Sequence, residues 1–236
     1  MTEVRAVLFD LDETLFDQQH ASASGLAAVA ERHVVLQALS LPDLELEYFR
    51  LLNTGHADVL AGRVSQTDAR ALRFRRLVER CGGAITFDQA TALASLYSGS
   101  YREARRPMAG AIDLLRHLQG RVSIGVLSNN FTAQQQEVLH CCGMTDLIDF
   151  LVTSEDVGHP KPHRAIFDAA LTRVGCTPEQ AVMVGDSWES DVLGASQVGI
   201  RPIWFNRRRA PQPTLDAGVL YSFEPLEDTV TMLLGD

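Results

Sequence analysis

The chain opens with a short apolar run that ends in two carboxylates. Residues 6–9 read Ala-Val-Leu-Phe, and Asp10, Leu11 and Asp12 follow directly. An apolar run of this kind is typical of a strand buried on both faces, as in a parallel sheet. Strand side chains alternate between faces, so Asp10 and Asp12 share one side if the extended conformation continues. The pair predicts either a bound divalent cation or a polar strand end that caps a loop.

A second apolar run ends in a hydroxyl and two amides. Residues 122–127 precede Ser128, Asn129 and Asn130, and helical spacing begins at Thr132. A strand, a short turn and a helix form a ready anion site, because the first N–H groups of a helix lack partners. Ser128 can add an O–H donor. Taken alone, the pattern is also that of an ordinary polar turn.

A lysine and two more acids occupy corresponding places further along. Lys161 stands between Pro160 and Pro162, just before a helix predicted over residues 163–174. Residues 181–185 form another apolar run, and it leads into Asp186 and then Asp191. The plain alternatives are a surface lysine and, for Asp191, an acid at the start of a helix.

Strand and helix patterns alternate in two stretches, residues 1–16 and 107–236. The pattern predicts strands over residues 4–10, 122–128, 149–153, 181–185, 201–205 and 219–221. It predicts helices over residues 111–119, 132–142, 163–174, 190–198 and 225–234. This order predicts an α/β fold with a doubly wound parallel sheet, whose ligands bind beyond the carboxyl ends of the strands. Residues 17–106 show helical spacing only and predict an inserted helical region.

Composition argues against nucleic-acid and membrane partners. The net charge is −9 and no extended basic face is evident, so we interpret residues 207–209 (Arg-Arg-Arg) as a solvated loop. No apolar run approaches the ~20 residues that span a bilayer, and no signal peptide is evident. Four cysteines without metal-site spacing favour a cytoplasmic protein. The oligomeric state is left open.

In this order, the motifs resemble those of the haloacid dehalogenase superfamily. The four are residues 10–14, Ser128, Lys161, and Gly185-Asp186 with Asp191. The resemblance implies a Rossmann-like core (residues 1–16 and 107–236) with a helical cap (17–106). Residues 128–136, 154–167 and 184–206 further resemble bacterial nucleoside 5′-monophosphatases of this superfamily.

The resemblance implies phosphoryl-transfer roles for three of these residues. Asp10 is the expected nucleophile and would form an aspartyl-phosphate. Asp12 would protonate the leaving alkoxide and later deprotonate the attacking water. Haloacid dehalogenases expel halide without a proton and lack this second acid, so Asp12 favours phosphate chemistry. Ser128 would bind a phosphate oxygen.

The remaining residues would hold the phosphate and a Mg²⁺ ion. Lys161 and the backbone N–H of Asn129 are expected to contact phosphate oxygens. The Asp10 and Asp186 carboxylates and the Asp12 carbonyl would coordinate Mg²⁺, with Asp191 either orienting or joining that shell. Glu13 and Asn130 depart from this pattern, because both stand where glycine is frequent in the family.

We therefore expect a Mg²⁺-dependent phosphomonoesterase for a small phosphate ester, with a nucleoside 5′-monophosphate as one candidate. A phosphotransferase or phosphomutase would use the same intermediate. A 2-haloacid dehalogenase and a non-catalytic phosphate-binding regulatory module are the remaining alternatives. Substrate recognition is expected from the helical region, whose candidate residues are Tyr48, Asn53, His56, Arg70, Arg73 and Tyr97.

Overall fold

The computed structural model describes residues 3–60, 63–213 and 217–235. The chain divides into two compact units. One, here called the α/β unit, comprises Met1–Asp17 and Arg106–Asp236, and the other, the helical unit, comprises Gln18–Arg105. The second unit is therefore an insertion between the first strand and the rest of the α/β unit.

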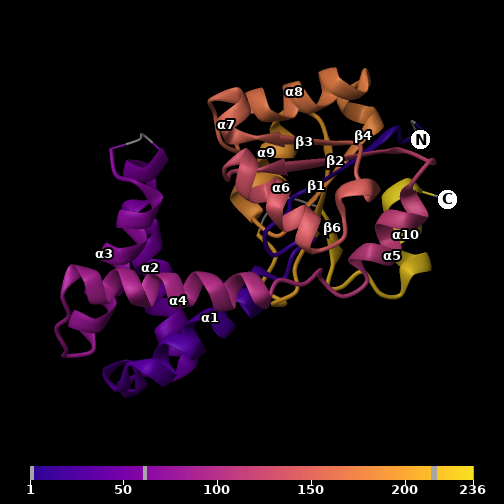
Figure 1. Ribbon diagram of the computed structural model, residues 1–236. Helices are drawn as coiled ribbons and strands as arrows, with labels where there is room; N and C mark the ends of the chain where they lie inside the picture. Colours follow the sequence, from indigo (N-terminus) through magenta and orange to yellow (C-terminus); the bar gives the residue numbers. More distant parts are fainter. Residues whose placement is uncertain (1–2, 61–62, 214–216, 236) are drawn as a thin grey trace. The chain divides into compact units, whose positions relative to one another are not determined.

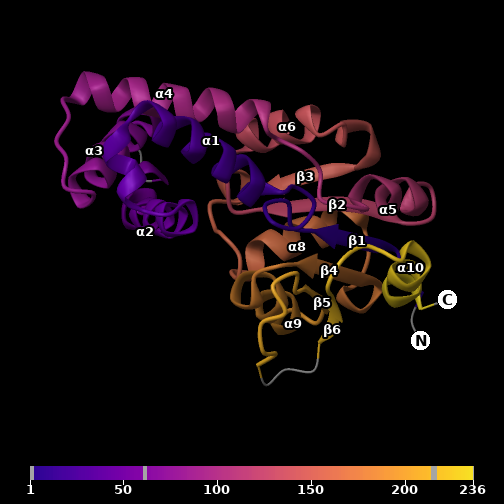
Figure 2. The same cartoon turned by 90° about the horizontal axis from the view of Figure 1, so that it is seen from below.

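The α/β unit is built on a parallel sheet of six strands, in the order β3-β2-β1-β4-β5-β6 (Figures 1 and 2). The strands are β1 (Ala6–Phe9), β2 (Ser123–Ser128), β3 (Phe150–Thr153), β4 (Ala181–Gly185), β5 (Arg201–Phe205) and β6 (Gly218–Leu220). The first strand lies in the middle, and Phe9 is in register with Val126 of β2 and Val184 of β4. The predicted fold class, a parallel α/β sheet with an inserted helical region, is confirmed.

Helices cover both faces of this sheet. They are α5 (Ala111–Leu118), α6 (Thr132–Cys141), α7 (Ser154–Val157), α8 (Arg164–Val174), α9 (Gly194–Gln197) and α10 (Leu226–Leu234). Leu8 packs in one core with Phe167 of α8 and Ala195 of α9. Its neighbour Phe9 points to the opposite face, where its ring meets Phe223 edge-on at a centroid distance of 6.5 Å. Because side chains alternate between faces along β1, the strand contributes to a hydrophobic core on each face of the sheet.

One predicted helix has a different form. Residues 190–198 were expected to be a single α-helix, but the structure has a π-helical turn, η4 (Trp188–Leu193), followed by α9. The N–H of Val192 bonds the carbonyl of Ser187, five residues earlier, at 3.3 Å. Such wide turns are rare and are often found at functional sites.

The helical unit has an aromatic core of its own. Its α-helices are α1 (Gln18–Arg32), α2 (Leu41–Leu60), α3 (Gln66–Arg80) and α4 (Phe87–Glu103). The rings of Tyr48, Phe74 and Tyr97 pack against one another with centroid distances of 4.9–5.5 Å. Within the described ranges, no helix is both long and apolar enough to cross a membrane.

The candidate recognition residues of this unit mostly serve its packing. Tyr48 and Tyr97 are buried, and Arg73 donates to the Tyr48 hydroxyl at 2.9 Å. Arg70 donates to Ser98 Oγ at 3.0 Å. The side chains of Asn53 and His56 lie outside the described residues.

The close contact between β2 and β3 can be tested at Gly125. A Cβ at this position would lie 2.3 Å from Phe150 Cζ, so Gly125→Ala should lower the free energy of unfolding by about 1–3 kcal/mol through overpacking. At Gly99, inside α4, a Cβ meets no neighbour, and Gly99→Ala should stabilise by up to about 1 kcal/mol. Urea unfolding curves would measure both values, and equal stability of the two variants would contradict the packing argument.

Candidate active site

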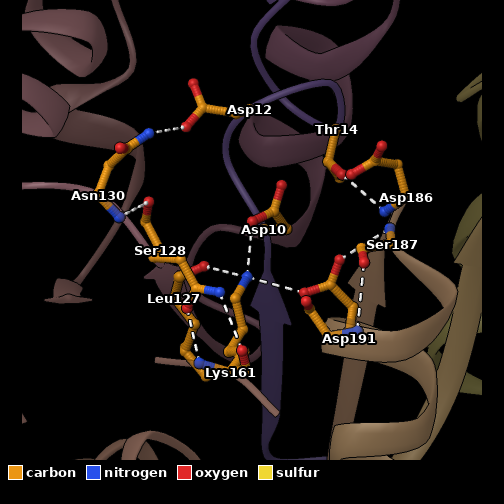
Figure 3. A network of polar contacts seen from close by, with 12 residues as sticks. Asp10, Asp12, Thr14, Leu127, Ser128, Asn130, Lys161, Asp186, Ser187 and Asp191 are labelled. Atoms are coloured by element: carbon orange, nitrogen blue, oxygen red, sulfur yellow. Dashed lines mark hydrogen bonds and ion pairs between the residues drawn. The ribbon is translucent and has the colours of Figure 1, made fainter. Parts of the chain in front are cut away.

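The predicted site residues meet at the carboxyl edge of the sheet (Figure 3). Asp10 directly follows β1, Ser128 ends β2, and Asp186 directly follows β4. Neighbouring parallel strands end at the same edge, so the sheet brings these three side chains together. Lys161 and Asp191 join them from the loop before α8 and from η4.

Lys161 is the buried centre of this cluster. Its Nζ donates to Asp10 Oδ1 at 2.6 Å and to the Leu127 carbonyl at 2.7 Å, and it lies 2.8 Å from Asp191 Oδ1. Burial favours the neutral amine, but the two carboxylates outweigh burial and hold the pKa of Lys161 above its ordinary value. The ammonium group therefore stays charged at neutral pH.

Three carboxylates face one another beside this ammonium. Asp10, Asp186 and Asp191 each place an oxygen within 4.8 Å of the others. Burial and the neighbouring acids raise the pKa of Asp10 well above its ordinary value, although Lys161 opposes this effect. Burial, together with Asp191 and Glu13, raises the pKa of Asp186 to about 7. When all three acids are ionised, the cluster holds more negative charge than one lysine neutralises.

The donor set fits a hard divalent cation. All three side chains offer carboxylate oxygens, which Mg²⁺ prefers. A bound cation would offset both the burial and the repulsion that raise the pKa of Asp10 and Asp186. The carboxylates of Asp10, Asp186 and Asp191 are therefore the residues suited to hold such an ion.

Two uncharged side chains to which the sequence analysis gave no role hold the Asp186 loop. Thr14 Oγ1 accepts from the backbone N–H of Asp186 at 3.1 Å, and Trp204 Nε1 donates to the Asp186 carbonyl at 2.9 Å. Next to them, Asp191 Oδ2 accepts from the N–H of Ser187 at 3.0 Å. Gly185 makes room for this arrangement, because a Cβ there would lie 2.3 Å from the carboxyl carbon of Asp191.

The carboxylate of Asp12 is held by two amides. Asn130 Nδ2 and Gln135 Nε2 donate to Asp12 Oδ2 at 2.8 and 2.7 Å. The sequence analysis did not select Gln135. The sequence does indicate that Gln135 is unusual. It shares the apolar face of α6 with Val138 and Leu139, and a polar side chain buried there needs a hydrogen-bond partner.

Asn129 fastens the lysine loop to the end of β2. Its side chain accepts from the backbone N–H of Lys161 at 2.6 Å and donates to the Lys161 carbonyl at 3.0 Å. The expected phosphate-binding groups, Ser128, Asn129 and Lys161, are thus adjacent in space. The sequence analysis did not predict the two hydrogen bonds between the Asn129 side chain and the backbone of Lys161.

A pair of charges shapes the loop after β1. Glu13 has a φ of 66°, in the left-handed region that favours glycine. The resemblance given in the sequence analysis implies glycine at this position. Arg207 donates to Glu13 Oε2 at 2.8 Å and to Asp17 Oδ1 at 3.1 Å. The interpretation of residues 207–209 as a solvated loop is therefore wrong for Arg207, whose side chain is only 31% exposed.

Sequence comparison places this site in a known family. The pattern of the haloacid dehalogenase-like hydrolases matches residues 4–199, which include every residue of the cluster. The chain belongs to this family. The predicted enzyme class, a haloacid dehalogenase-like hydrolase, is confirmed.

Relatives of this hydrolase carry the names of phosphatases with different substrates. A ribulose-1,5-bisphosphate 5-phosphatase of Halopiger xanaduensis is 34% identical over 85% of this chain and 84% of its own. The pyrimidine 5′-nucleotidase YjjG of Escherichia coli is 31% identical over 88% of both chains. In fold, the hydrolase resembles magnesium-bound YfnB of Bacillus subtilis, with a TM-score of 0.75, 23% identity, and coverage of 96% of this chain and 98% of that one. The likeness to nucleotidases is therefore not distinguished from that to other phosphatases.

Cation binding at this site should depend on pH. A raised carboxyl pKa means that the metal-free folded protein binds an extra proton between the ordinary pKa and about 7, so its stability falls as pH rises through that window. Mg²⁺ must displace this proton below pH 7. We expect Mg²⁺ to raise the melting temperature by several degrees near pH 8, and by much less near pH 5.5.

Thermal unfolding with and without Mg²⁺ at both pH values measures this effect. Asp186→Asn should abolish the shift, while Asp113→Asn, an exposed acid on α5, should keep it. An unchanged shift in Asp186→Asn would contradict the assignment of the cation to these carboxylates.

Proposed function

We propose that the protein is a Mg²⁺-dependent phosphomonoesterase that forms an aspartyl-phosphate on Asp10. The observation that carries this proposal is the convergence of Asp10, Lys161 and Ser128 beside the acid cluster. Phosphate monoesters are among the slowest bonds to hydrolyse in water, and their catalysis depends mainly on positioning and on neutralising charge. A buried nucleophile next to a charged ammonium group meets both needs.

In the first step, a carboxylate oxygen of Asp10 attacks phosphorus. The bond from phosphorus to the substrate's ester oxygen breaks as the new bond forms, and Asp12 gives its proton to that oxygen. Lys161 and Ser128 bind phosphate oxygens during this transfer, and the ammonium of Lys161 offsets the repulsion between Asp10 and the dianionic phosphate.

In the second step, water hydrolyses the aspartyl-phosphate. Asp12, now ionised, takes a proton from the attacking water, and Asp10 is released as a carboxylate together with inorganic phosphate. Asp10, Asp186 and the carbonyl of Asp12 would hold Mg²⁺, and Asp191 would orient or complete that shell. When bound, Mg²⁺ supplies positive charge that neutralises the phosphate and favours ionised Asp10.

The substrate in this proposal is a small phosphorylated metabolite that the helical unit, acting as a cap, selects. A nucleoside 5′-monophosphate remains a candidate, supported by the likeness to the pyrimidine 5′-nucleotidase. Asp12 favours phosphate over haloacid substrates, because a departing halide takes no proton. It also argues against a binding module, which would need neither a nucleophile nor an acid.

Replacing the nucleophile tests the central step. Asp10→Asn should reduce phosphate release by at least about 10⁴-fold, because an amide is a poor nucleophile for phosphorus. Circular dichroism should show an intact fold, and Asp113→Asn should retain full activity. Near-normal turnover by Asp10→Asn would overturn the nucleophile assignment.

Metal removal tests the cation separately. EDTA should abolish phosphate release, because it removes the cation that the carboxylates of Asp10, Asp186 and Asp191 would hold. Added Mg²⁺ should restore the release. A screen of nucleotides, sugar phosphates and short organic phosphates would provide the activity measurement and narrow the substrate. Full activity after exhaustive chelation would contradict the Mg²⁺ requirement.

A further inference from the structure

The amide of Gln135 links two groups of the site. Its Nε2 donates to Asp12 Oδ2 at 2.7 Å and to Ser128 Oγ at 2.6 Å. An amide NH₂ carries two hydrogens, so one can go to each acceptor. The nitrogen faces Asp12, because an amide oxygen in its place would repel the ionised carboxylate that the second step requires.

Burial makes the loss of these two hydrogen bonds costly. The Gln135 side chain comes from α6 and is 1% exposed, and Ser128 is also 1% exposed. Water therefore does not readily replace a lost donor, and an unpaired buried polar group is costly. The contact with Asp12 spans 123 residues of chain, so it depends on the assembled sheet rather than on the local turn.

A second amide acts on the same oxygen. Asn130 Nδ2 donates to Asp12 Oδ2 at 2.8 Å, as Figure 3 shows, and Asn130 is only half-buried. Its backbone N–H also donates to Ser128 Oγ, at 3.2 Å. Asn130 and Gln135 therefore each donate to both Asp12 and Ser128.

We propose that Gln135 is a positioning residue for proton transfer by Asp12, with Asn130 as its partner. The inference rests on the phosphomonoesterase function proposed above. An oxygen that already accepts two N–H donors is a poor site for another hydrogen, so the proton that Asp12 transfers lies on Oδ1. Two fixed donors to Oδ2 also set the rotation of the carboxyl group, and with it the direction of Oδ1.

This role concerns the first chemical step. The Oδ1–H bond of Asp12 breaks as its proton joins the ester oxygen, while phosphorus changes its bond from that oxygen to Asp10. Small misplacements of a reacting group can lower a rate by orders of magnitude. The loss should be greatest where the leaving group most needs the proton.

Leaving-group dependence provides the test. Phenyl phosphate and p-nitrophenyl phosphate have similar shapes, but p-nitrophenolate departs readily without a proton. The parameter to compare is kcat/KM, which reports steps up to departure of the leaving group and not the later hydrolysis of the aspartyl-phosphate. We expect Gln135→Leu to lower kcat/KM on phenyl phosphate at least about 10-fold more than on p-nitrophenyl phosphate, as Asp12→Asn should also do.

Matched variants separate positioning from structure. Gln136→Leu changes the neighbouring exposed glutamine of α6 and should leave both rates unchanged. If Gln135→Leu does not fold, Asn130→Ala at the half-buried position carries the same expectation.

Two outcomes have different meanings. The positioning role would be overturned if folded Gln135→Leu lost kcat/KM equally on both esters, and the phosphomonoesterase function would still stand. If Gln135→Leu does not fold, the same result in Asn130→Ala would overturn the role. If wild-type protein cleaves neither these esters nor any phosphate in the screen, or if Asp10→Asn retains cleavage, the function itself fails.

Discussion

The ion cluster around Lys161 Nζ is the interaction on which the site depends. A buried charge is tolerated only when it is paired, and removing one partner leaves another charge uncompensated. Lys161 contacts Asp10, which lies 151 residues earlier in the chain, as well as Asp191 in η4. The loop before α8, the end of β1 and the π-helical turn are therefore held together by one ammonium group. The negative charge left over makes the same place suited to a cation.

Uncharged polar side chains around this cluster have a different task. Asn129 fixes the backbone of Lys161, Thr14 and Trp204 fix that of Asp186, and Gln135 links Asp12 to Ser128. Neutral hydrogen bonds orient charged groups without cancelling their charge. Such a shell allows the site to keep an excess of acids in a defined geometry.

In this proposal, the α/β unit carries the chemistry and the helical unit selects the substrate. Relatives named for different phosphate substrates align with more than four-fifths of the chain, so the shared motifs do not specify a substrate. Tyr48 and Tyr97 are taken up by the aromatic core of the helical unit. Recognition of the substrate must therefore rely on other side chains than these two.

The sequence alone determined the strands, the parallel sheet and the meeting of Asp10, Ser128 and Asp186 at one edge. These follow from local apolar periodicity and from the rule that parallel strands share a carboxyl edge. Only the tertiary structure decided that Gln135 reaches Asp12 and that Arg207 pairs with Glu13. Those contacts join segments 123 and 194 residues apart, and a local pattern contains no information on which distant side chains will meet.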